Sequence, residues 1–252
     1  GQGSLLALQA AIADIKAGKI DVLVTAPINK YNIQSADFKF PGHTEYLASA
    51  FDTKEVLMLL VSETMKVGVV TGHVPLSQVP SLITKEAILT KLRLLNKSMV
   101  EDFGIRRPRI AVMGLNPHAG DHGVIGLEER DIIIPALSQA NEEGIVAMGP
   151  YPSDGFFGSD SFTKFDAILA MYHDQGLAPF KVINFDTGVN FTAGLPIIRT
   201  SPDHGTAYDL AGKNEANPNS FRQALYLAVD LFKNRQYHKE LTANPLKTID
   251  PD

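Results

Sequence analysis

VGVVT (residues 67–71), TKEAILTKLRLLNKSMVEDF (residues 84–103) and RIAVMG (residues 109–114) are the three consecutive segments that decide the fold class. The first and the third are short apolar runs of the kind found in buried strands. The second repeats apolar residues every three or four positions, which predicts a long amphipathic helix that ends at Gly104. The order strand, helix, strand is typical of α/β proteins and favours a largely parallel sheet.

The same alternation continues on either side of this unit. Strands are predicted at residues 22–25, 55–61 and 167–171, and helices at residues 5–17, 127–141 and 220–232. Ser4 is the expected N-cap of the first helix and Gly18 its end, and a short helix with a frayed tail is expected after Arg235. We find no internal repeat and no low-complexity linker.

The composition excludes several classes of protein. The chain has 252 residues, 44% of them hydrophobic, which is enough to bury a substantial core. A net charge of −5 argues against a nucleic-acid or anionic-membrane partner. The chain has no cysteine, so any bound metal must use imidazole or carboxylate ligands. No apolar stretch reaches membrane-spanning length and no signal peptide opens the chain, so we expect a cytoplasmic protein.

Three predicted strands are each followed within a few residues by a histidine: His73, His118 and His173. Neutral imidazole is the commonest protein ligand for divalent transition metals, and three such ligands leave coordination positions open for a substrate. The separations along the chain are too long for a local metal-binding motif. A hydrogen-bonded loop role for each histidine therefore remains an alternative to one shared catalytic metal site.

Two further clusters suit an anionic ligand. PGHTE (residues 41–45) places His43 and Thr44 before a helical stretch, where backbone N–H groups can bind an anion; an ordinary helix cap by Thr44 is the alternative. Lys181, Asn190 and Arg199 lie in a stretch with few acids, and their ammonium, amide and guanidinium groups would suit a carboxylate or phosphate. The alternative is that the two basic residues are solvated surface charges.

The stretch DHGTAYDLAG (residues 203–212), continuing to EANP (residues 215–218), is too specific to be a generic turn. The chain has no Gly-x-Gly-x-x-Gly after a strand, so the usual dinucleotide fingerprint is absent. If a dinucleotide binds, a different loop must hold it.

Six strings together identify a family resemblance: VTAPINK, PGHTEYLA, GLNPHAG, AMYHDQGLAPFK, GVNFTAGLPIIRTSPDHGTAYDLAG and ANPNSF. They closely resemble the 4-hydroxythreonine-4-phosphate dehydrogenase family of vitamin B6 biosynthesis, from about residue 23 to the helix after Ser220. The resemblance implies the isocitrate/isopropylmalate dehydrogenase-like α/β fold, with two intertwined lobes around a central cleft across residues 1–252. It also implies a homodimer with the active site at the subunit interface.

The chain departs from the family at its start. It begins at Gly1 without an initiator Met, and it lacks the GDPAGIGPE-like segment that usually opens the family's first strand. We therefore expect that an N-terminal part of the first lobe is missing, and the lobe boundaries stay undefined.

The resemblance also implies cofactors and site residues. The cofactors are NAD or NADP and a divalent metal, zinc, magnesium or cobalt. The implied metal ligands are His73, His118 and His173; the substrate contacts are His43, Thr44, Lys181, Asn190 and Arg199; the cofactor contacts are His204, Gly205 and Asn217.

The implied reaction oxidises the C3 hydroxyl of 4-phosphooxy-L-threonine to give 2-amino-3-oxo-4-phosphooxybutanoate, which decarboxylates to 3-amino-2-oxopropyl phosphate in pyridoxine 5'-phosphate biosynthesis. The metal would lower the pKa of the hydroxyl and stabilise the developing alkoxide. Lys181 or a metal-bound water is the expected proton acceptor. Asp154 and Asp174 lie near the metal-binding loops in sequence and are expected to fix an imidazole tautomer.

Three other functions were compared with this one. A paralogue acting on D-threonate or D-erythronate 4-phosphate would use the same motifs. A catalytically dead binding protein of the same fold is a second alternative, against which the intact set of three histidines argues. A metal-dependent hydrolase could use the same ligands but would not explain residues 203–212.

Overall fold

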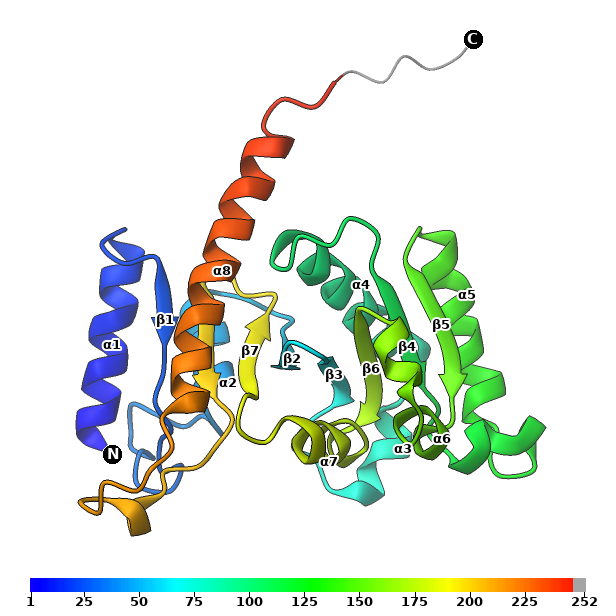
Figure 1. Ribbon diagram of the computed structural model, residues 1–252, viewed down its shortest axis with the longest axis horizontal. Helices are drawn as coiled ribbons and strands as arrows, with labels where there is room; N and C mark the ends of the chain where they lie inside the picture. Colours follow the sequence, from blue (N-terminus) through cyan, green and yellow to red (C-terminus); the bar gives the residue numbers. More distant parts are fainter. Residues whose placement is uncertain (247–252) are drawn as a thin grey trace.

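An eight-stranded sheet, in the order β1-β8-β7-β2-β3-β6-β4-β5, forms the centre of the molecule (Figure 1). The structure is a computed structural model and describes residues 1–246. The strands are β1 Val22–Val24, β2 Leu57–Val61, β3 Lys66–Thr71, β4 Arg109–Met113, β5 Val146–Tyr151, β6 Ala167–Tyr172, β7 Val189–Ala193 and β8 Ile198–Pro202. The α/β class is confirmed.

The sheet is mixed, so the prediction of a largely parallel sheet was wrong in its middle. Strands β3, β6, β4 and β5 are parallel, as are β1 and β8, but β8, β7, β2 and β3 pair antiparallel. The reason is connection length: only four residues separate β2 from β3, and four separate β7 from β8. Connections this short can join only antiparallel neighbours. Gly194, at φ +91°, supplies the left-handed residue that the second hairpin needs.

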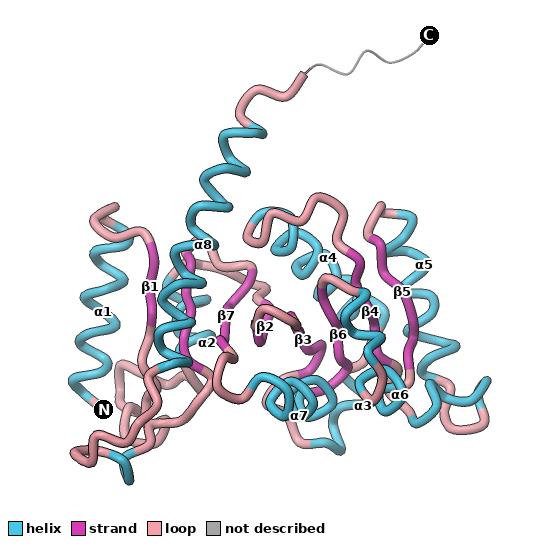
Figure 2. The backbone as a smooth tube through the Cα atoms, viewed as in Figure 1, coloured by secondary structure: helices cyan, strands magenta, loops and turns pink. Residues whose placement is uncertain are grey.

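Helices cover both faces of the sheet (Figure 2). They are α1 Gln2–Lys16, α2 His43–Ala50, α3 Val79–Leu82, α4 Lys85–Glu101, α5 Ile134–Glu142, α6 Ser153–Phe157, α7 His173–Asn184 and α8 Asn219–Thr242. Helices α4, α5 and α8 pack in one apolar cluster on one face, α6 and α7 belong to a second cluster, and α1 and α2 to a third. Within residues 1–246, no helix is both long and apolar enough to cross a membrane.

The helix ends differ in places from the prediction. Thr84 caps α4, because its hydroxyl accepts a hydrogen bond from the Ala87 backbone N–H at 3.1 Å. Helix α1 begins at Gln2, so Ser4 lies inside it and is not its N-cap. Helix α8 runs unbroken past Arg235 to Thr242, and its C-terminal half extends away from the sheet (Figure 1). The tail predicted to fray falls partly on residues 247–252, outside the described residues.

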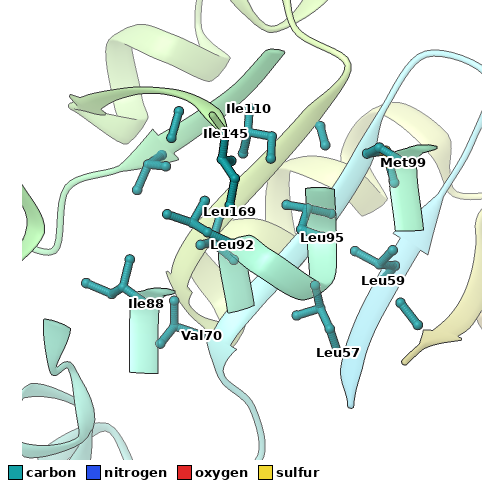
Figure 3. Close-up of a cluster of buried hydrophobic side chains, with 14 of the residues drawn as sticks. Leu57, Leu59, Val70, Ile88, Leu92, Leu95, Met99, Ile110, Ile145 and Leu169 are labelled. Atoms are coloured by element: carbon teal, nitrogen blue, oxygen red, sulfur yellow. The ribbon is translucent and has the colours of Figure 1, made fainter. Parts of the chain in front are cut away.

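The first apolar cluster fixes one face of the sheet. Leu57, Leu59 and Val70 meet Leu92 and Leu95 of α4, all of them buried (Figure 3). Each such side chain contributes about 1.5–3 kcal/mol relative to an exposed one. Successive residues of a strand point to opposite faces, so the neighbours of these core residues face the other side.

The other face holds the second and third apolar clusters, and polar side chains lie between them. Phe191 of β7 and Ile198 of β8 belong to the first cluster. Their neighbours Asn190 and Arg199 therefore point to the opposite face, between α7 on one side and α1 and α2 on the other. This polar region is where the candidate site lies.

Candidate active site

Arg199 is the most unusual charged residue of the site. Its side chain is only 5% exposed, yet within residues 1–246 no carboxylate lies within ion-pair distance of it. Its Nε donates a hydrogen bond to Thr25 Oγ1 at 3.0 Å, and its Nη1 donates to Thr192 Oγ1 at 3.5 Å. Burial lowers the pKa of the guanidinium to about 10, against the opposing effect of the Glu45 charge. A desolvated cation without an acid is a natural partner for an anionic ligand.

Two cavities meet at Arg199. One has a volume of about 400 Å³ and the other about 380 Å³. Both are lined by Lys30, His43, Met58, His73, Asn190 and Arg199, so they share one polar wall. The Oδ1 atom of Asn190 is buried there and has no hydrogen-bond partner in the part of the chain that the structure describes. A ligand that donates a hydrogen bond at this point would satisfy it.

His43 and Thr44 lie at the start of α2. His43 is the first residue of the helix, Gly42 is the N-cap, and Thr44 makes no capping hydrogen bond. Burial, followed by the charges of Arg199 and Lys30, lowers the pKa of His43 to about 4. His43 is therefore a neutral imidazole at physiological pH, and both residues line the larger cavity.

The register of two parallel strands brings His73 and His173 together. Thr71 of β3 pairs with Tyr172 of β6, and the histidines follow two and one residues later. The ring centroids lie 5.4 Å apart. His173, which was expected in a loop, is the first residue of α7. Burial is the main cause that lowers the pKa of His73, which favours the neutral form that binds metals.

Asp174 contacts His173 directly. Its Oδ1 lies 2.7 Å from His173 Nδ1. A proton on Nδ1 would be held by this carboxylate, leaving Nε2 with a free lone pair. Asp154 instead lies exposed on α6 and lines neither of the two cavities, so its role remains a prediction.

His118 lies apart from the other two histidines. It follows β4, it is exposed, and it lines neither cavity. In the described part of the chain, no three His, Cys, Asp or Glu side chains are grouped so that they could hold a metal ion. One chain thus brings two of the three predicted ligands together, and the third lies elsewhere in that chain.

The remaining predicted residues lie around the smaller cavity. Lys181 Nζ is 3.3 Å from Asp203 Oδ2, and both residues line this cavity with His204 and Gly205. Burial raises the pKa of Asp203, while the Lys181 charge opposes this. Asn217 lies outside the cavity lining, where its amide nitrogen is 3.5 Å from Asp186 Oδ1.

Sequence reasoning missed two residues of this site, Lys30 and Asp203. Both stand in strings that were singled out: Lys30 ends VTAPINK, and Asp203 begins DHGTAYDLAG. Lys30 lines both cavities and its charge lowers the pKa of His43 and of His73. The signal that could have found Lys30 is a basic residue in the loop that follows a predicted strand, residues 22–25.

Comparison with known proteins identifies the family. The family model described as "Pyridoxal phosphate biosynthetic protein PdxA" matches residues 1–228. The chain belongs to this family. A relative from Bacteroides thetaiotaomicron named 4-hydroxythreonine-4-phosphate dehydrogenase is 54% identical over 98% of this chain and 68% of its own length. A relative of the same name from Sulfurihydrogenibium sp. is 48% identical over 94% of this chain and 73% of its own length.

Solved structures agree with the PdxA assignment. The crystal structure of 4-hydroxythreonine-4-phosphate dehydrogenase from Klebsiella pneumoniae superimposes with a TM-score of 0.79 and 38% identity, over 89% of this chain and 69% of that one. The chain therefore has the isocitrate/isopropylmalate dehydrogenase-like fold that was predicted. The PdxA relatives are dehydrogenases, and the division into two lobes remains a prediction.

Proposed function

We propose that this protein oxidises 4-phosphooxy-L-threonine with NAD or NADP, and that the product then loses its carboxylate to give 3-amino-2-oxopropyl phosphate in pyridoxine 5'-phosphate biosynthesis. The observation that carries the proposal is Arg199, which is buried, has no acidic partner among the described residues and faces two cavities. Membership of the PdxA family supports the identity of the substrate.

The charges around the cavities support a substrate with two anionic groups. Arg199 and Lys30 lie on the wall shared by both cavities, and Lys181 lies in the smaller one. The proposed substrate carries a phosphate and a carboxylate, each of which is well matched by a guanidinium or an ammonium group. Asn190 Oδ1 would accept a hydrogen bond from the substrate's ammonium or hydroxyl group.

The histidines support a divalent metal, zinc, magnesium or cobalt. His73 and His173 offer two imidazoles from one chain, and Asp174 holds Nδ1 of His173 so that Nε2 can coordinate. We assign the third ligand to His118 of a second copy, because His118 is exposed and apart from the pair in its own chain. A metal held there supplies a Lewis acid that lowers the pKa of the substrate hydroxyl and accepts electron density at the new carbonyl.

The residues of the chain then have separate tasks. Arg199, Lys30, His43 and Thr44 bind and orient the substrate, and the apolar side chain of Met58 limits water in the shared wall. Lys181, once it has given its own proton to Asp203, or water would take the hydroxyl proton. A nicotinamide held near His204 and Gly205 would accept the hydride from C3. The C–CO₂ bond then breaks, its electrons move to the carbonyl, and a proton restores the ketone.

Asp203 is placed to support that proton transfer. It lies 3.3 Å from Lys181, and its burial raises the pKa of its carboxyl group. His204 and Gly205 line the neighbouring end of the cavity, and with Asn217 they are the residues proposed to contact the nicotinamide cofactor. This arrangement would place the cofactor next to Lys181.

Substrate turnover tests the reaction. The purified protein is assayed for reduction of NAD and of NADP with 4-phosphooxy-L-threonine, and separately with D-threonate and D-erythronate 4-phosphate, in the presence of zinc, magnesium or cobalt. We expect the highest kcat/KM with 4-phosphooxy-L-threonine. A higher value with a sugar-acid phosphate would replace the substrate assignment, and no reduction with any of them would support a non-catalytic role.

Mixing two variants tests the shared metal site. His73→Ala and His118→Ala chains are each expected to lose metal and activity. In a mixed dimer, one site would carry both defects and the other would carry neither, so mixing should restore up to half of the sites in each heterodimer. Failure of the mixture to regain any metal, with the dimer confirmed by sedimentation, would mean that the three histidines do not share a site.

A further inference from the structure

The segment that carries His118 has an improbable backbone. Five consecutive residues, from His118 to His122, have φ between +43° and +81°. Four of them are not glycine, and the left-handed region costs an L-residue about 1–2 kcal/mol. Such a turn persists only where the surrounding structure holds it in place.

Glu129 holds this turn in place through hydrogen bonds and packing. Its side chain is only 4% exposed, although no Lys, Arg or His within residues 1–246 forms an ion pair with it. Oε1 accepts hydrogen bonds from the backbone N–H groups of Leu115 and Asn116, both at 2.7 Å. Oε2 accepts a third from Asn116 Nδ2 at 2.9 Å. Three donors thus replace the water that this buried carboxylate has lost.

The same carboxylate contacts the middle of the turn. A Cβ atom on Gly120 would lie 2.6 Å from Glu129 Oε2, so the glycine backbone packs directly on that oxygen. Gly120 also has φ +81°, and its carbonyl accepts a hydrogen bond from the Ile125 N–H at 3.0 Å. Glu129 therefore touches the turn both before His118, at residues 115 and 116, and after it, at Gly120.

We propose that Glu129 is a positioning residue for His118. It fixes the left-handed turn, so that the His118 imidazole is pre-organised at the protein surface. This inference rests on the proposed function in one respect, the role of His118 as a metal ligand. The stabilisation of the turn by Glu129 is a separate claim, and it can be measured in the metal-free protein. Residues that orient a ligand in this way usually change metal affinity by about 10–100-fold when they are replaced.

Glu128 provides a matched control next to Glu129. A single oxygen, Glu128 Oε2, accepts hydrogen bonds from Asn116 Nδ2 at 2.8 Å and from the Leu127 N–H at 3.0 Å. The amide oxygen of Glu128→Gln can take over both bonds. Glu129 uses both of its oxygens, so Glu129→Gln would bring an NH₂ group against Asn116 Nδ2. Each substitution removes one negative charge, and only the second should loosen the turn.

The first measurement is hydrogen exchange of the metal-free protein, followed by mass spectrometry. For Glu129→Gln we expect faster exchange confined to peptides covering residues 114–126, and for Glu128→Gln the wild-type pattern. The second measurement is Co²⁺ titration, with the visible spectrum of the bound ion as the reading of its coordination. We expect about a tenfold or greater loss of affinity and an altered spectrum for Glu129→Gln alone.

The outcomes separate the inference from the proposed function. Wild-type exchange in residues 114–126 of Glu129→Gln would overturn the inference, whatever the metal does. Faster exchange with unchanged Co²⁺ binding in both Glu129→Gln and His118→Ala would keep the stabilisation of the turn by Glu129 but remove His118 from the ligand set. If Glu129→Gln does not fold, Asn116→Ala takes its place, because it removes one of the three donors to Glu129; unchanged exchange in that variant would also overturn the inference.

Discussion

Replacing Arg199 by methionine should make the unliganded protein slightly more stable. Burial lowers the guanidinium pKa from its usual range to about 10, which corresponds to a cost of about 3 kcal/mol for keeping the charge in the fold. The substitution removes this cost but also removes two hydrogen bonds to Thr25 and Thr192, each contributing about 1 kcal/mol. The expected net result for Arg199→Met is a gain of about 1 kcal/mol.

Arg235→Met is the contrasting variant. Arg235 pairs through Nε with the carboxylate of Asp102, which is only 2% exposed and is otherwise bonded by Ser98 Oγ at 2.6 Å. Its removal leaves a buried carboxylate without its cation, and such losses cost about 3–5 kcal/mol. Two arginine-to-methionine changes in one protein should therefore have opposite effects on stability.

The assay is urea unfolding followed by circular dichroism, with and without inorganic phosphate as a substitute for the phosphate group of the substrate. Phosphate that binds only the folded state stabilises it by about 2.7 kcal/mol at a concentration 100 times its Kd. We expect this gain in the wild type and in Arg235→Met, and its loss in Arg199→Met. A loss of 3 kcal/mol or more in unliganded Arg199→Met, with the phosphate response retained, would refute the reasoning.

Three further predictions concern single residues. The pKa of His43 is about 4 in the fold and 6.5 in the unfolded chain, so the unfolded chain takes up the proton first and stability should fall as the pH drops from about 6.5 to 4; His43→Gln should flatten this slope in urea unfolding at a series of pH values. Asp174→Asn should weaken Co²⁺ binding, measured by titration, by about tenfold, the lower end of the usual range, because the Asp174 side chain is 85% exposed. Thr84→Ala should lower the free energy of unfolding by about 1 kcal/mol, because it leaves the Ala87 N–H without its cap.

Each of these has a result that would contradict it. An unchanged pH slope in His43→Gln would mean that other groups cause the acid sensitivity. Wild-type Co²⁺ affinity in Asp174→Asn would show that the imidazole of His173 is oriented without the carboxylate. For Thr84, Thr84→Ser is the control, since it keeps the capping hydroxyl; equal losses in both variants would exclude capping as the cause.

The sequence predicted the elements whose apolar residues follow a regular pattern. Strands such as β3 and β6 were found because they are short apolar runs, and helix α4 because its apolar residues recur every three or four positions toward the core. Strand β8 was missed because it reads IRTSP, although all five residues are buried. Arg199 belongs to the candidate site. Its charged side chain interrupts the apolar pattern from which a strand would be predicted, so the functional residue hides the strand.

The sequence predicted which residues belong to the site better than it predicted where they lie relative to one another. Nine of the predicted residues line the two cavities, among them His43, Lys181 and Arg199. The position of His118 could not be read from the sequence, because five left-handed residues in a row depend on the tertiary contacts of Glu129. The closeness of His73 and His173 depends on strand register, which spans about 100 residues of chain.

The register of β3 and β6 constrains which insertions and substitutions the sequence can accept during evolution. Inserting one residue between Thr71 and His73 would shift the His73 imidazole relative to that of His173 by up to about 3.3 Å, the rise per residue of a strand. Insertions of equal length at the ends of both β3 and β6 would keep the two imidazoles together. The two strand ends should therefore vary in length only together. Substitutions within the strands that preserve the apolar packing and the backbone pairing should, by contrast, leave the spacing of the histidines unchanged, because the pairing sets that spacing.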